Sequence, residues 1–282
     1  MTSSTDQISV SAKMADLPSH ALVSYFAITF AITWGIGGTF IFLPDWAEAT
    51  FGQLSGLHPL YFLATWAPAI AGIGLVWAYG GLSGLRAFFS RLTLWRGGLW
   101  WLFILIAMPL VFIAGSLIKG GGLLADLPEE GLGVAFLITG LMFFLGPIEE
   151  FGWRGVALPI LQRHVAPVWA AIIIGTVWGL WHLPAFYLSG VVFADWDFPL
   201  FLCGCVVLAV LVTPIFNATQ GNLLLPMMFH WQAIIPFWPD AQPWDTWIFA
   251  AIAAVIIWVK RDTMFSSPGA VTRVIPATNS VM

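Results

Sequence analysis

The sequence contains few charged residues, and this scarcity excludes most soluble folds. Of its 282 residues, 9% are Asp, Glu, Lys or Arg, against roughly a quarter in ordinary soluble domains. Hydrophobic residues make up 60% of the chain, with 17 Trp and 23 Phe, and the mean hydropathy is +0.90. A soluble fold must cover its outside with polar groups, and a nucleic-acid binder needs a basic face. The composition therefore excludes both, and it indicates a polytopic membrane protein.

Cysteine is also scarce, and no internal repeat is visible. The two cysteines, Cys203 and Cys205, lie in one apolar run without a Cys or His cluster nearby, so we interpret them as packing residues. Secondary transporters are commonly built from duplicated halves, so the lack of a repeat disfavours a small transporter or channel.

Apolar runs long enough to cross about 30 Å of hydrocarbon follow one another along the chain. The fourth, seventh and eighth of them are short for a span, so we expect them to tilt, break or borrow flanking residues. We predict an all-α fold with one transmembrane helical domain (20–260), a polar N-terminal segment (1–19) and a mobile cytosolic tail (261–282). The eight predicted spans are 20–43, 58–79, 98–118, 132–148, 165–188, 198–217, 221–238 and 246–259.

The positions of Lys and Arg predict the orientation of these spans. If the N-terminus lies inside, only Lys119 falls in an outer segment, and this asymmetry is a strong positive-inside bias. We therefore expect a multi-pass protein of the cell membrane with both termini in the cytosol, and an interfacial helix at Arg86–Arg96 on anionic headgroups. The inner cations are Lys13, Arg86, Arg91, Arg96, Arg154, Arg163, Lys260, Arg261 and Arg273. The outer acids are Asp45, Glu48, Asp195, Asp197, Asp240 and Asp245.

Ionisable residues in or beside the spans are few, and each is a functional hypothesis because its burial is costly. Glu150 and Arg154, at i and i+4 at the end of the fourth span, are spaced for an ion pair. Glu149 is turned by about 100° from Glu150 and has no cation at that spacing. A carboxylate without such a partner is a candidate general base. The alternative is that both acids merely lie at the headgroup level.

Two histidines lie within apolar runs, His182 in the fifth and His230 in the seventh. Trp178 shares a helix face with His182, since the two are four residues apart. A lone histidine in an apolar helix is more often a packing residue. Two of them together with Glu149 suggest a hydrolytic centre.

The segment around the glutamates carries a resemblance to a known family. Two glutamates, three residues and an arginine form the first motif of the CPBP intramembrane proteases, also called the CAAX-protease and bacteriocin-processing or abortive-infection family. Glu149, Glu150 and Arg154 match this motif, and the extension at 155–159 is similar to that of bacterial members.

Two further motifs extend the resemblance to most of the chain between about residues 60 and 235. An aromatic residue, three residues and a histidine are matched by Trp178 and His182. In the third motif a histidine is followed four residues later by asparagine or a similar residue. His230 fits this motif, but Ile234 stands where the asparagine is expected.

The resemblance implies about eight transmembrane helices around a cytosol-facing cavity. It also implies hydrolysis of a peptide bond in a membrane-associated peptide or protein, prenylated at a CAAX-type end or bacteriocin-like. Glu149 and His182 would activate a water molecule, and His230 would assist the oxyanion. The lipid bilayer is the other expected partner, and no nucleic acid is expected.

The resemblance assigns supporting positions as well. Glu150, Arg154 and Trp178 would hold the site together, and Asn217 or Asn222 could supply the donor that Ile234 lacks. No cofactor is certain: one glutamate and two histidines could complete an open site for a divalent metal such as zinc, and a mechanism without metal fits the same residues. In that case the metal ligands would be Glu149, His182 and His230. The alternative function, which Ile234 favours, is a non-catalytic membrane scaffold or immunity-type member of the same family.

Overall fold

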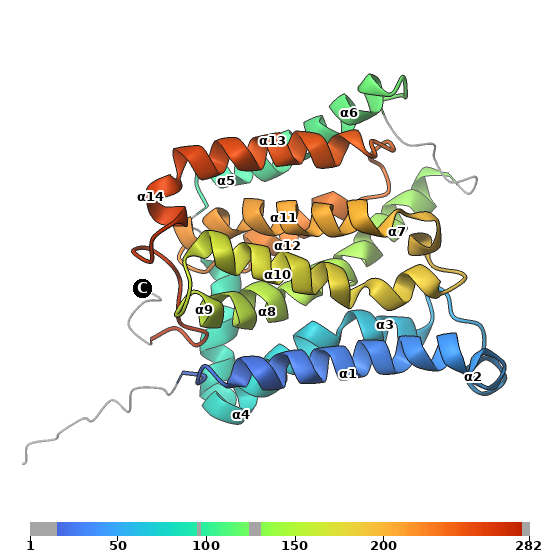
Figure 1. Cartoon of the computed structure of the whole chain (residues 1–282), viewed down its shortest axis with the longest axis horizontal. Coiled ribbons are helices and arrows are strands. Elements are labelled where there is room, and N and C mark those ends of the chain that lie inside the picture. The colour runs from blue at the N-terminus through green and yellow to red at the C-terminus, as the bar shows by residue number, and fades with distance from the viewer. Residues whose placement is uncertain (1–15, 95–96, 124–130, 278–282) are drawn as a thin grey trace, which may run out of the picture.

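The computed structural model describes residues 16–94, 97–123 and 131–277, and these residues form helices and connecting loops without a strand (Figure 1). Within them, six helical segments are long and apolar enough to cross a membrane, and one shorter apolar helix accompanies them. The prediction of an all-α polytopic membrane protein is confirmed.

The main helices mostly run along the long axis of the molecule in Figure 1. In chain order they are α1 (Ala21–Phe42), α2 (Pro44–Phe51), α3 (Pro59–Thr65), α4 (Ala67–Phe89), α5 (Leu99–Leu102), α6 (Met108–Ile118), α7 (Leu132–Phe143), α8 (Glu150–Gly152), α9 (Leu158–Leu161), α10 (Pro167–Trp181), α11 (Phe198–Ala218), α12 (Leu224–Ile234), α13 (Trp244–Val259) and α14 (Arg261–Met264). The seventh and eighth predicted spans became α12, with 11 residues, and α13, with 16. Neither reaches the length of a full span, because the chain leaves the helix at Ile235 in one and begins it only at Trp244 in the other.

The second predicted span consists of α3 and the first part of α4. Gly81 then has φ +58, a conformation that glycine adopts without steric cost, and the helix kinks there. Figure 1 shows the rest of α4 turning across one end of the bundle, as expected for the interfacial segment. Arg91 belongs to this interfacial segment, but its side chain does not reach the lipid headgroups. Its guanidinium is buried and donates to the carbonyl oxygens of Gly155 at 3.2 Å and Arg273 at 2.6 Å.

The fourth span does not end at residue 148 as predicted. A helical segment continues from Leu132 to Leu161, with a 3-10 turn over Gly146–Glu149 and a π turn over Trp153–Ala157. Pro147 in the 3-10 turn lacks an N–H group and so interrupts regular α-helical bonding. Glu149 consequently lies inside a 30-residue segment and not at its edge.

The two ends of the bundle differ in composition. We call the end that carries the start of α1, the second part of α4 and α14 the arginine-rich end, and the opposite end, with α2, the acidic end (Figure 1). In the described residues, the cations at the arginine-rich end are Arg86, Arg91, Arg163, Lys260, Arg261 and Arg273. The loops and helix ends at the acidic end contain Asp45, Glu48, Asp195, Asp197 and Asp240, with Lys119 as their one cation among the described residues.

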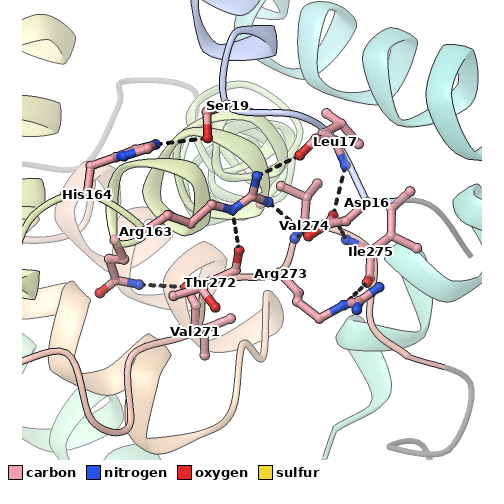
Figure 2. A network of polar contacts seen from close by, with 12 residues as sticks. Asp16, Leu17, Ser19, Arg163, His164, Val271, Thr272, Arg273, Val274 and Ile275 are labelled. Atoms are coloured by element: carbon pink, nitrogen blue, oxygen red, sulfur yellow. Dashed lines mark hydrogen bonds and ion pairs between the residues drawn. The ribbon is translucent and has the colours of Figure 1, made fainter. Parts of the chain in front are cut away.

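The predicted tail is partly docked onto the arginine-rich end (Figure 2). Asp16 Oδ1 accepts the backbone N–H groups of Val274 at 3.1 Å and Ile275 at 3.0 Å. Both of these side chains have no exposed surface. The hydrophobic effect and these hydrogen bonds hold residues 271–275 in place, which differs from the mobile tail expected for 261–282.

Arg163 ties the N-terminal and C-terminal segments together. Its guanidinium donates to the carbonyl oxygens of Thr272 at 2.7 Å and Leu17 at 2.6 Å, and it forms an ion pair with Asp16 at 2.8 Å (Figure 2). One side chain thus joins the turn after α9 to both ends of the described chain.

We expect Arg163→Ala to lower the free energy of unfolding by about 1.5–3 kcal/mol, the usual contribution of hydrogen bonds to a charged group. Arg261→Ala, at the same end but with an exposed side chain, is the matched control and should unfold as the unmodified protein does. The measurement is thermal unfolding of the purified protein in detergent. Equal thermal unfolding midpoints for the two variants would show that the contacts of Arg163 contribute no stability.

Candidate active site

The three residues predicted to do the chemistry lie around one cavity. A cavity of about 590 Å³, which we call the main cavity, is lined by Glu149, His182 and His230. A second one of about 160 Å³, the side cavity, shares the two histidines and extends between α11 and α13. Residues from three separate helical segments therefore meet at one place, as the sequence predicted.

Glu149 is held by two indole groups. Its Oε2 atom accepts Trp178 Nε1–H at 2.8 Å and Trp153 Nε1–H at 3.2 Å, and the side chain is buried. In the described part of the chain no protein group donates to Oε1. The partner four residues on is thus a neutral indole and no cation, which leaves the carboxylate one oxygen for the main cavity.

Glu150 forms the predicted ion pair and also binds a histidine. Its Oε1 accepts Arg154 Nη1–H and His230 Nδ1–H, each at 2.9 Å. All three side chains are buried. Because a buried charge is stable only when it is paired, this cluster fixes the positions of α8 and α12 relative to each other.

His182 is oriented by the backbone. Its Nδ1–H donates to the carbonyl oxygen of Trp178 at 2.9 Å, since a carbonyl can only accept. In the neutral imidazole this leaves a lone pair on Nε2. Pro184 shortly follows His182 and cannot continue the helix, so α10 ends here and gives way to a 3-10 turn.

Trp178 contacts Glu149, Arg154 and both histidines. Its ring lies 5.2 Å from that of His230 and 5.7 Å from that of His182, between ring centroids. The Arg154 guanidinium lies over it at 5.3 Å, close enough for a cation–π interaction. The aromatic residue of the second motif thus supports the glutamate, the arginine and both histidines.

The two asparagines do not reach either cavity. Asn217 exchanges hydrogen bonds with Gln162 and accepts the backbone N–H of Val271. Asn222 donates to the carbonyl oxygen of Leu94 and caps the start of α12 by accepting Leu225 N–H. The expectation that one of them supplies an oxyanion donor is therefore corrected. Asn222 precedes α12, which begins only at Leu224, so it does not share a helix face with His230 as its spacing suggested.

The donor atoms do not form a metal site in this geometry. Among the described residues, no group of three or more His, Cys, Asp or Glu side chains is arranged to hold a metal ion. The atoms that hydrogen bonds leave available on the three residues, Glu149 Oε1 and Nε2 of each histidine, are not grouped around one point that could hold an ion. The residues that the sequence suggested as zinc ligands therefore do not form a zinc site in this arrangement. No step of the reaction proposed below uses a metal.

Sequence reasoning missed three residues at the site. Trp153 is visible from its i+4 spacing to Glu149, but an indole is not an obvious partner for a carboxylate. Gly146 lies so close to His230 that a Cβ atom there would stand 2.7 Å from Nε2. Tyr61 on α3 lines the main cavity and interacts electrostatically with Glu149. No motif in the sequence around Tyr61 predicts that it belongs to the site.

Comparisons with known proteins identify related sequences. A family model described as type II CAAX prenyl endopeptidase Rce1-like matches residues 131–233, which include Glu149, His182 and His230. A protein named CAAX prenyl protease 2, from Methanococcus maripaludis, is 23% identical over 184 residues, covering 59% of this chain and 68% of that protein.

We expect Gly146→Ala to lower proteolytic activity by about 10²-fold, because the added methyl group displaces the His230 ring and small misplacements have effects of this size. Gly140→Ala on α7, where a Cβ meets nothing within 4 Å, is the control and should keep full activity. The activity of both variants is measured as the release of new peptide termini from membrane peptides. Full activity of Gly146→Ala would contradict the prediction that activity depends on the position of the His230 ring.

Proposed function

Because the chain belongs to the CPBP family and is a membrane-embedded protease, we propose that it cleaves membrane-associated peptides with Glu149 and His182 as the groups that activate water. The observation that carries the proposal is the single cavity lined by Glu149, His182 and His230. These are the residues that match the three motifs of the family.

The proposed reaction begins with a water molecule between Glu149 Oε1 and His182 Nε2. Glu149 takes a proton from this water as the hydroxide attacks the peptide carbonyl, and later the proton passes to the amine that leaves. The two indoles on Oε2 support this role, because they orient the carboxylate without neutralising it. His182 supports it through the lone pair on Nε2, which can accept a hydrogen bond from the water.

The position of His230 supports a role for it at the oxyanion. Its Nδ1 atom lies 2.9 Å from Glu150 Oε1, and this contact fixes the ring within the buried cluster. The ring lines the main cavity together with Glu149 and His182. Nε2 is the ring atom left to meet the oxyanion, and an Nε2–H there would donate to it.

Tyr61 is our candidate for the donor that Ile234 cannot supply. Three side-chain hydroxyls line the main cavity, those of Thr33, Tyr61 and Thr65. Thr33 donates to Ala64 O and Thr65 to Tyr61 O. Among the described residues nothing hydrogen-bonds to the Tyr61 hydroxyl, so it remains available to the substrate.

The lining of the cavities favours an apolar peptide. Phe193 and Trp196 line both cavities, and Trp181 lines the main one. Such rings offer large apolar surfaces that bind apolar side chains. A prenylated CAAX-type end and a bacteriocin-like peptide are both compatible with them.

The alternative function, a non-catalytic scaffold or immunity-type protein, is favoured by Ile234. Its side chain faces Gly146 beside the His230 ring, and neither Asn217 nor Asn222 compensates for it. Activity of the purified protein decides between the two functions.

Glu149→Gln should lower cleavage by 10²–10⁴-fold or more, because the amide keeps the shape but cannot accept a proton. His182→Ala should have a similar effect, and the double variant should be little worse than either single, since the two act on one water. The assay incubates purified protein in liposomes with membrane peptides from cells that lack it, and mass spectrometry counts new termini. Asp262→Asn, exposed on α14, is the control.

Equal cleavage by the unmodified protein and Glu149→Gln would end this mechanism, and no cleavage by either would favour the scaffold. The same assay is run with a chelator. If chelation alone abolishes cleavage and added zinc restores it, Glu149, His182 and His230 are metal ligands in a rearranged site.

Tyr61→Phe should lower kcat by about 10²–10³-fold, the usual effect of removing one oxyanion donor, with little change in KM. The hydroxyl is all that this substitution removes, so folding should be preserved. Tyr187→Phe serves as the control, because that ring is 69% exposed. Unchanged kcat for Tyr61→Phe would remove Tyr61 from the proposal.

A further inference from the structure

The side cavity adjoins the main cavity at the two candidate catalytic histidines. His182 and His230 line both cavities, whereas Glu149 lines only the main one. Ile234 also lines both, so the third motif places an apolar side chain where the two cavities meet. A peptide bond held against the histidines would therefore lie next to the side cavity.

The side cavity has the size of a single side chain. Its volume is about 160 Å³, and an apolar protein cavity of about 150 Å³ holds a molecule as large as benzene. The main cavity is much larger, at about 590 Å³. We therefore expect one side chain of a bound peptide to enter the side cavity while the neighbouring residues stay in the main one.

Aromatic rings form much of the wall of the side cavity. The centroid of the Phe201 ring lies 5.0 Å from that of His182 and 5.5 Å from that of Phe193, and both pairs are edge to face. Phe112 on α6 and Phe249 on α13 line the cavity as well, with their centroids 5.8 Å apart. Aromatic rings favour such pairings at centroid distances of about 4.5–7 Å, so a ring from the substrate would find partners here.

The start of α13 adds polar groups to this lining. Asp245 Oδ1 accepts the backbone N–H of Thr246 at 2.7 Å and its hydroxyl at 3.4 Å. An acidic side chain in the cavity would bring a second carboxylate beside Asp245, and burying two such groups together is unfavourable. A neutral ring, with or without a hydroxyl group, avoids this cost.

Gly204 keeps space open in the side cavity. It lies within α11 and lines the cavity, and a Cβ atom there would meet only Thr246 Oγ1, at 3.8 Å. Gly175 and Gly179 on α10 differ, because a Cβ at either would stand 2.5 Å from an atom of α11. Those two glycines allow the helices to approach closely. Gly204 has no such packing role, although glycine is unfavourable inside a helix.

We propose that the side cavity is a specificity pocket for an aromatic side chain, phenylalanine or tyrosine, of a residue next to the cleaved bond, and that Gly204 keeps this pocket open. The proposal rests on the proteolytic function proposed above. The ring enters past His182 and His230 and packs against Phe201, which holds the adjoining peptide bond at the histidines. Gly204 is thus a specificity-determining residue.

The residues around each cleaved bond test the pocket. Purified protein in liposomes is incubated with membrane peptides from cells that lack it, and mass spectrometry identifies the residues on both sides of each cut. We expect phenylalanine and tyrosine to be enriched at one of the two flanking positions. The best-cleaved peptide is then synthesised with phenylalanine or alanine at that position.

Gly204→Leu should fill the pocket. We expect the ratio of kcat/KM for the phenylalanine peptide to that for the alanine peptide to fall by roughly 10–100-fold, the usual selectivity of an apolar pocket. Gly140→Leu is the matched control, because Gly140 is exposed on α7, lines neither cavity and has nothing within 4 Å of a Cβ atom. It should keep the ratio of the unmodified protein.

Val207→Ala tests the same wall in the opposite direction. Val207 lines the side cavity and not the main one, and the substitution removes two methyl groups from the lining. We expect kcat/KM for a peptide with the larger naphthylalanine at the flanking position to rise by roughly tenfold relative to the phenylalanine peptide. Loss of folding cannot produce a gain of this kind.

Photocrosslinking tests binding without proteolysis. The probe is a short apolar peptide with a diazirine-bearing phenylalanine at its centre, and the protein carries Glu149→Gln. Mass spectrometry locates the crosslinks, which we expect on the α11 residues of the pocket, Phe201, Val207 and Leu208. Gly204→Leu should remove most of them. Excess peptide with phenylalanine at the centre should compete, and the same peptide with glutamate should not.

The outcomes separate the inference from the function on which it rests. Cleavage without an aromatic preference beside the cut, a preference that Gly204→Leu leaves unchanged, or crosslinks outside the side cavity would each overturn the inference, and the proteolytic function would stand. If the purified protein cleaves no membrane peptide, the proteolytic function is wrong. The crosslinks alone then decide whether the side cavity binds an aromatic side chain.

Discussion

The shared carboxylate of Glu150 is the interaction on which the site depends. One oxygen binds the guanidinium of Arg154 and the imidazole of His230, and the Arg154 charge lies in turn over the Trp178 ring. Three helical segments that carry the candidate catalytic residues are thereby joined through one buried cluster. In an apolar interior none of these charges has water as an alternative partner, so each must keep its place. Glu149 has no cation beside it and is held by the indole N–H groups of Trp153 and Trp178.

The helical segment that contains Glu150 and Arg154 also separates the two ends of the bundle. From Phe151 to Ile160 it is buried against α4, α10 and the docked tail, whereas Gly146 and Glu149 border the main cavity. Arg91 and Arg163 are used for internal hydrogen bonds at the arginine-rich end, which fixes the tail there. The main cavity extends from Glu149 toward the acidic end, where Leu54, Gly190 and Pro236 line it.

Several features were predictable because they depend on residues close in the chain. The ion pair between Glu150 and Arg154 and the common face of Trp178 and His182 follow from helical spacing, and both are present. The extent of the fourth span was predicted wrongly, since hydropathy treats Glu149 and Glu150 as a boundary. Their partners in the folded protein, Trp178 and His230, are far away in sequence, and these partners are what allow the two acids to lie inside the bundle.

The sequence by itself determined that this chain is a helical membrane protein and where most of its spans lie, and two of its motifs predicted a glutamate and a histidine for hydrolysis. These conclusions rest on composition and on the fixed period of the helix, which are local properties. Only the tertiary structure decided that Asn217 and Asn222 serve other contacts, that Tyr61 lines the main cavity, and that this cavity extends toward the acidic end. Each of these depends on contacts between segments distant in sequence, and helical spacing carries no information about which distant side chains will meet.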